Sequence, residues 1–211
     1  MRVSFDPARD AFAFRNTFSN KCTIARVPIT ETHGRCGGMV FAALDHWHAK
    51  IPVPATEELP PDGEPLADYI HDRMRTSMID NWERFVLFMR SPDQRIPFSG
   101  TPVSRLVRDE ELPKLIALLA DGQPQPLGLS QARTMAGLAQ DLQVLAYGYE
   151  QDDTRTRIFI WDTRYGRRED VLEFTTRDVP DHRGIEHSDG SHWRGFFVER
   201  YSAKVPPYVK V

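Results

Sequence analysis

The hydrophobic pattern of this chain changes period part-way along its length, and this change constrains the fold more than any other feature. Up to residue 120, apolar side chains recur every three to four positions, which is typical of helices that bury one face. Beyond residue 125, short apolar runs are separated by polar turns, which is typical of strands. Helices followed by strands predict an α+β fold in which a helical part packs on an antiparallel sheet.

The first predicted helix begins at Cys36 and continues to Trp47. Residues 66–89 predict one broken helix or two short ones, because Thr76 and Ser77 can cap a second helix, and residues 109–120 predict a further helix. The predicted strands are residues 127–129, 143–149, 157–161, 171–174 and 196–201, of which the second and third form a hairpin.

The composition fits a single domain spanning residues 1–211. Hydrophobic residues make up 40% of the chain, which is enough to bury a core. A net charge of −3 argues against nucleic acid as a partner, and no run of about 18 apolar residues predicts a membrane span. Because the opening residues also lack the apolar stretch of a signal peptide, we expect a cytoplasmic protein whose two cysteines, Cys22 and Cys36, are free.

Cys36 lies in a glycine-rich turn at the start of the first predicted helix. The N-H groups and the field at a helix N-terminus favour a thiolate and can also hold an oxyanion. Gly37 and Gly38 would let a substrate approach the backbone, so both are candidate substrate-binding residues. A buried, inert thiol beside a glycine turn fits the same residues equally well.

Several segments, taken together, resemble one family. Residues 34–45 (GRCGGMVFAALD) look like the nucleophile helix of papain-like cysteine peptidases, in particular a bacterial group related to the bacteriocin-processing peptidases. Residues 124–129 (PQPLGL), 143–149 (QVLAYGY) and 158–162 (IFIWD) resemble the strands of that group in the same order. The resemblance covers residues 12–201 and implies a papain-like fold for the domain.

The resemblance implies a cysteine nucleophile, a histidine base and an Asp or Asn that orients the histidine. Cys36 matches the nucleophile and Asp162 matches the orienting carboxylate. Where the family has its histidine, directly before Gln-Val-Leu, this chain has Leu142. Leucine can neither accept a proton from the thiol nor protonate a leaving amine, so ordinary peptide hydrolysis is not expected unless another histidine takes over.

Four other histidines are candidates to replace the missing base or to bind a metal. His33 precedes Cys36 by three residues, so we take it as a candidate catalytic residue beside Cys36 and Asp162. His182, His187 and His192 follow one another at intervals of five residues in a polar loop. Their spacing matches no standard zinc pattern and no cysteine is near, so we expect neither a metal nor a cofactor.

Two functions remain open. In the first, Cys36 acts as the nucleophile of a noncanonical hydrolase, acyltransferase or cyclase on an activated ester, thioester or amide. In the second, the chain is an inactive pseudo-peptidase whose cleft binds a peptide or a small molecule, with Leu142 forming an apolar floor. In either case Tyr147 and Trp161 are candidates for stacking on a flat substrate.

Overall fold

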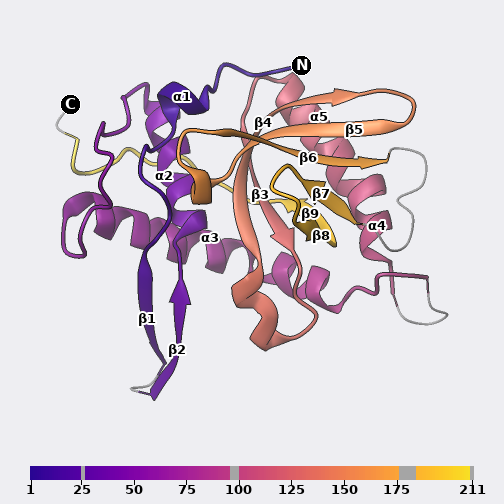
Figure 1. Ribbon diagram of the computed structural model, residues 1–211, viewed down its shortest axis with the longest axis horizontal. Helices are drawn as coiled ribbons and strands as arrows, with labels where there is room; N and C mark the ends of the chain where they lie inside the picture. The colour runs from indigo at the N-terminus through magenta and orange to yellow at the C-terminus, as the bar shows by residue number, and fades with distance from the viewer. Residues whose placement is uncertain (25–26, 96–99, 176–183, 210–211) are drawn as a thin grey trace.

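The computed structural model describes residues 1–24, 27–95, 100–175 and 184–209 (Figure 1). Before the main sheet lie α1 (Pro7–Asp10), the strands β1 (Ser19–Ile24) and β2 (Val27–His33), and the helices α2 (Cys36–Ala49), α3 (Pro65–Arg90), α4 (Val103–Leu106) and α5 (Leu112–Ala120). The main sheet consists of β3 (Gln125–Ser130), β4 (Leu142–Gln151), β5 (Arg155–Trp161), β6 (Glu169–Thr175), β7 (Ile185–His187), β8 (His192–Trp193) and β9 (Gly195–Val198). The predicted α+β class is confirmed. Within these ranges, no helix is long and apolar enough to cross a bilayer.

The main sheet has seven strands in the order β8-β7-β6-β5-β4-β3-β9, and neighbouring strands are antiparallel. β4 and β5 form the predicted hairpin, and the other predicted strands correspond to β3, β6 and β9. β9 ends at Val198, three residues before the predicted end. The short strands β7 and β8, which extend the sheet beyond β6, were not predicted.

The two faces of β4 and β5 belong to two different apolar clusters, because successive side chains of a strand point to opposite faces. On one face Val144 and Ile160 pack with α4, α5 and the second half of α3. On the other face Leu145 and Trp161 pack with apolar residues of the N-terminal segment, with α2 and with the first half of α3. Both faces are therefore covered by helices, and the sheet passes between them.

Helix α3 differs from the prediction because it runs without a break from Pro65 to Arg90. The hydroxyl of Thr76 donates to the carbonyl of Asp72, and that of Ser77 donates to the carbonyl of Met74. Both polar side chains thus find partners inside the helix and do not cap a new one. The predicted interruption is wrong.

The predicted helix over residues 109–120 begins earlier, at Val103. A π-helical turn, Val107–Glu111, joins α4 to α5 and directs Glu111 into the interior. There its carboxylate accepts the N-H of Val198 at 2.7 Å and pairs with Arg84. Glu111, from the acidic first turn of the predicted helix, therefore holds the end of β9 in place through a buried hydrogen bond.

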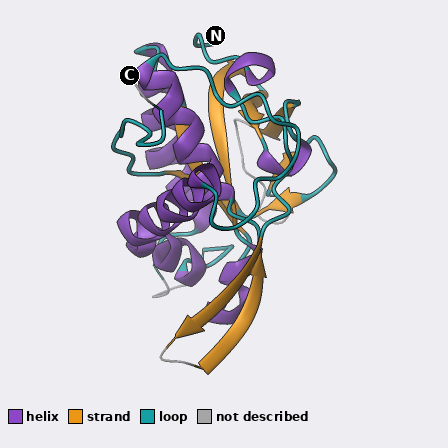
Figure 2. Cartoon of the chain, turned by 90° about the vertical axis from the view of Figure 1, so that its left-hand side faces the viewer, coloured by secondary structure: helices purple, strands orange, loops and turns teal. Residues whose placement is uncertain are grey.

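A two-stranded hairpin formed by β1 and β2 was also not predicted. The strands pair antiparallel from Ser19 opposite His33 to Ile24 opposite Val27. Figure 2 shows this hairpin extending away from the body of the molecule. Its second strand leads directly into the turn that precedes Cys36.

Helices α2 and α3 approach each other closely at Gly38. A Cβ atom added there would lie 2.0 Å from the carbonyl oxygen of Ile70, a backbone atom that cannot move aside. We expect Gly38→Ala to lower the free energy of unfolding by about 1–3 kcal/mol, because the two helices must separate. Urea unfolding of Gly38→Ala beside Gly137→Ala, where the nearest atom would be 3.6 Å away, measures the effect. Equal stabilities of the two variants would contradict the expectation.

Candidate functional site

The turn before Cys36 is held in place by contacts from distant parts of the chain. The N-H of Arg35 donates to the side chain of Asn16 at 2.6 Å, and the guanidinium of Arg35 pairs with Asp62 at 2.6 Å. Arg35 takes the N-cap position, so Cys36 is the first residue of α2, as predicted. Its thiol therefore lies at the helix N-terminus, where α2 meets the start of β4.

Cys36 belongs to a polar cluster between helices and sheet, made of Cys36, Ser77, Gln143 and Glu199 and called here the Cys36 cluster. The N-H of Gln143 donates to the Cys36 sulfur at 3.4 Å, and the thiol lies 3.9 Å from Gln143 Oε1. Ser77 Oγ lies 3.5 Å from the same Oε1, and Gln143 Nε2 donates to Glu199 Oε1 at 2.7 Å. Gln143 thus links the thiol of Cys36 to the carboxyl group of Glu199, the residue that follows β9.

Burial dominates the acid-base properties of the Cys36 cluster. It raises the pKa of Glu199 to about 8, although the Gln143 hydrogen bond acts in the opposite direction. Glu199 Oε2 is buried and has no hydrogen-bond partner in the described part of the chain. Burial also raises the pKa of Cys36 to about 11, against the N-H groups of Gln143 and Gly37, which lower it. At neutral pH Cys36 is therefore a thiol, and the helix terminus does not make it a thiolate.

The space beside Gly37 and Gly38 is occupied by the protein itself. A Cβ atom at Gly37 would lie 2.0 Å from Gln143 Oε1 and 2.4 Å from Ser77 Oγ, and one at Gly38 would meet the backbone of α3. Both glycines are buried. They allow α2 to approach its neighbours, and their predicted role in substrate binding stays a prediction.

Leu142 and Asp162 lie on neighbouring strands of the hairpin, close to Cys36. Leu142 begins β4 and is part of the apolar cluster against which Cys36 packs. Asp162 follows Trp161, the last residue of β5, which pairs with Leu145 of β4. Asp162 is near enough to the thiol for its charge to contribute to the raised pKa of Cys36. Leu142 thus lies beside Cys36 in the core, while Asp162 acts on the thiol through its charge without a direct contact in the described part of the chain.

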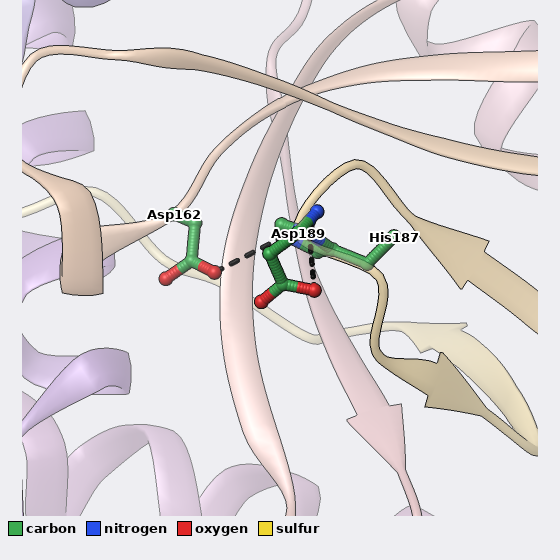
Figure 3. A group of neighbouring side chains, drawn as sticks. All are labelled: Asp162, His187 and Asp189. Carbon is green, nitrogen blue, oxygen red and sulfur yellow. Dashed lines mark hydrogen bonds and ion pairs between the residues drawn. The ribbon is translucent and has the colours of Figure 1, made fainter.

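Asp162 is fully buried and contacts Arg164 and His187, both of which also contact Asp189; these four residues are called here the Asp162 cluster. Arg164 Nη2 donates to Asp162 Oδ2 at 2.6 Å, and His187 Nε2 lies 3.2 Å from the same oxygen. In Figure 3, dashed lines mark the contacts of His187 with Asp162 and with Asp189. Burial opposes ionisation of Asp162, but the contacts with His187 and Arg164 outweigh it and lower the pKa of this carboxyl.

His187 is the histidine that meets Asp162, yet both of its ring nitrogens are engaged within the Asp162 cluster. Nε2 faces Asp162, while Nδ1 lies 3.1 Å from Asp189 Oδ1 and accepts the N-H of Asp189 at 3.0 Å. The side chain is fully buried. Nδ1 is thus occupied, while Nε2 is buried close to Asp162 without a hydrogen bond in the described part of the chain, and the sulfur of Cys36 contacts Gln143 there and not His187.

Asp162, His187 and Asp189 also have the composition of a metal site, since their ligand atoms lie within 4.8 Å of one another. The guanidinium of Arg164, however, bridges the two carboxylates, at 2.6 Å from Asp162 Oδ2 and 3.0 Å from Asp189 Oδ2. A fixed positive charge thus occupies the place where a cation would bind. The Asp162 cluster is therefore an internal network in which Arg164 lies between the two carboxylates.

A search of protein-family models, of curated proteins and of solved structures found no match to this chain. The likeness to papain-like peptidases therefore rests on the sequence segments quoted above.

The aromatic candidates lie inside the core. Tyr147 is 2% exposed and its hydroxyl donates to Glu169 at 2.7 Å, while Trp161 is 0% exposed and donates to the carbonyl of Gly166 at 2.6 Å. A ligand could stack on either ring only after the core had opened. Their predicted role in substrate binding also stays a prediction.

Three further histidines of the described ranges have other surroundings. His46 and His48 pack against aromatic side chains near the C-terminus, and His192 is exposed on β8. The side chain of His33 and the whole of His182 lie outside the described residues, so the predicted contact between His33 and Cys36 stays a prediction.

Sequence reasoning missed Gln143, Glu199 and Arg164. Glu199 follows four buried residues of β9, and a charged residue at a strand end usually marks the return to solvent. Gln143 directly follows Leu142, the residue at the position of the family's histidine. Its proximity to the Cys36 thiol could therefore have been predicted from the same resemblance. No sequence pattern predicted a role for Arg164, because its bond to Asp162 depends on the tight turn after β5.

Proposed function

We propose that this chain is a papain-like protein that has lost thiol-peptidase chemistry and serves to bind a peptide or a small molecule. The observation that carries the proposal is the contact of Cys36: the N-H of Gln143 donates to its sulfur in a place where a thiol peptidase needs an imidazole, and burial raises the pKa of the thiol. The Asp162 carboxylate, which would orient that imidazole, is engaged by Arg164 and His187.

The papain-like part of the proposal is supported by the order and the positions of the elements. A helix that begins at its cysteine meets the start of β4, and the next strand, β5, ends at Trp161, directly before Asp162. This order accompanies the segment-by-segment resemblance of the sequence. Acyl transfer through Cys36 is the competing function, and it would need the thiolate that burial disfavours.

Two measurements test the proposal. Hydrolysis of p-nitrophenyl acetate and of a fluorogenic dipeptide should be the same for the wild type and for Cys36→Ala, with no burst of product. The immobilised protein should enrich a common motif from a random-peptide display library, and the free peptide should bind in calorimetry without being consumed. Turnover that depends on Cys36 would refute the proposal, as would a library selection that enriches no motif.

Restoring the missing base alone should not restore hydrolysis. We expect Leu142→His to raise the rate of p-nitrophenyl acetate hydrolysis by less than about tenfold, well below the 10²–10⁴-fold that general-base catalysis provides. The reason is that Asp162 is already bonded to Arg164 and His187, so a new imidazole has no free carboxylate to orient it.

Two variants accompany this measurement. Leu142→Gln controls for the loss of an apolar side chain, and Leu142→His combined with His187→Ala frees one side of Asp162 and should exceed Leu142→His alone. A rise of about a thousandfold or more in Leu142→His by itself would show that the catalytic site is intact except for its base.

A further inference from the structure

A hollow of about 570 Å³ lies beside the segment that leads from α1 to β1, and two arginines line it. Arg15 comes from this segment and Arg167 from the loop between β5 and β6 (Figure 1). The hydroxyl-bearing Thr17 and the apolar Leu59 are also part of the lining, with Glu57 as the acidic residue. With two guanidinium groups and one carboxylate, the lining of the hollow has a net positive charge.

Arg167 is held in position by the backbone around it. Its Nε donates to the carbonyl of Ala11 at 2.9 Å, which orients the guanidinium and leaves its Nη groups for another partner. The preceding residue, Gly166, has a φ of 67°, and a Cβ atom there would lie 2.9 Å from the carbonyl oxygen of Ala13. Glycine is needed at this position because the loop turns in the left-handed region while touching the neighbouring segment.

Arg15 and Arg167 are exposed, and neither forms an ion pair with any carboxylate of the described ranges. The two arginines that flank Arg167 in the same loop are both paired, Arg164 with Asp162 and Arg168 with Asp170. Two arginines of the loop thus form ion pairs with neighbouring carboxylates, and the third, Arg167, lines the hollow.

The same segment connects the hollow to Cys36. Asn16, next to Arg15, accepts the N-H of Arg35 and donates its own N-H to the carbonyl of Thr163 at 2.9 Å. Phe18 accepts the N-H of Gly34 at 2.7 Å. The segment that lines the hollow is therefore bonded directly to the turn that precedes Cys36.

We propose that this hollow binds the C-terminal carboxylate of a peptide, with Arg15 and Arg167 as the carboxylate-binding residues. A guanidinium offers parallel N-H donors that match the two oxygens of a carboxylate, and Leu59 provides an apolar contact for the last side chain. The inference deepens the proposed binding function, on which it rests, by naming the end of the peptide that is recognised.

Fluorescence anisotropy with dansyl-Ala-Leu-Leu, as the free acid and as the C-terminal amide, tests the inference. The acid should bind at least about tenfold more tightly than the amide, because charge-assisted hydrogen bonds contribute about 1.5–3 kcal/mol. Arg15→Ala and Arg167→Ala should each abolish this preference, Arg167→Lys should retain part of it, and Arg75→Ala, an exposed arginine on α3, should leave it unchanged. Far-UV circular dichroism of each variant confirms that it is folded.

Equal binding of the acid and the amide overturns the inference. So does inorganic phosphate binding that depends on Arg15 and Arg167 while the acid peptide does not bind, since the hollow would then be a phosphate site. Turnover that depends on Cys36, found together with a preference for the acid, would refute the proposed function and leave the carboxylate site standing. No preference and no turnover would refute the carboxylate site alone.

Discussion

The wild type is expected to lose stability as the pH rises from about 5 to about 8, and replacing Glu199 with glutamine should remove this loss. The pKa of Glu199 is raised by burial to about 8 in the folded protein, from an ordinary value near 4.5. Between these values the folded state keeps a proton that the unfolded state has released, so the free energy of unfolding falls by about 1.4 kcal/mol per pH unit. The stabilising effect is complete below the unfolded pKa and is lost as the pH rises through 8. Over the whole interval it amounts to about 5 kcal/mol.

Urea unfolding at several pH values measures this effect. The wild type should become less stable than Glu199→Gln by a growing margin as the pH rises, because glutamine can still accept the hydrogen bond from Gln143 and does not ionise. Glu186→Gln, on the exposed side of β7, controls for the removal of a carboxyl group as such. Parallel curves for the wild type and Glu199→Gln would mean that Glu199 is not buried as described.

Cys36 is expected to react with iodoacetamide about 300-fold more slowly than a free thiol at neutral pH, in a Cys22→Ser background. The reactive species is the thiolate, and a pKa of about 11 leaves far less of it than the value of about 8.5 for free cysteine. The rate should rise about tenfold per pH unit until the pH approaches that pKa. An active thiol peptidase would behave in the opposite way, with a thiolate already present at neutral pH.

Mass spectrometry of timed alkylation mixtures gives the rate, and the same reaction in concentrated urea gives the value for the exposed thiol. The difference between these two conditions isolates the effect of the folded surroundings. Alkylation of the folded protein as fast as in urea would contradict both the raised pKa of the thiol and the proposed loss of peptidase chemistry.

The sequence was informative wherever a property depends on neighbours along the chain. The change of hydrophobic period predicted helices before strands, and the glycine turn predicted a helix starting at Cys36. The predicted break in α3 was wrong because Thr76 and Ser77 can either cap a helix or bond within it, and only the surrounding structure selects one of these.

The sequence by itself determined the order of helices and strands, the cysteine at a helix start, and the leucine where a base would be expected. These depend on local periodicity and on the identity of single residues. The tertiary structure alone decided that Gln143 joins Cys36 to Glu199, which is 56 residues further along the chain, and that His187 and Arg164 engage Asp162. Strand order and register bring such groups together, and burial then sets their charge, so no local pattern in the chain carries this information.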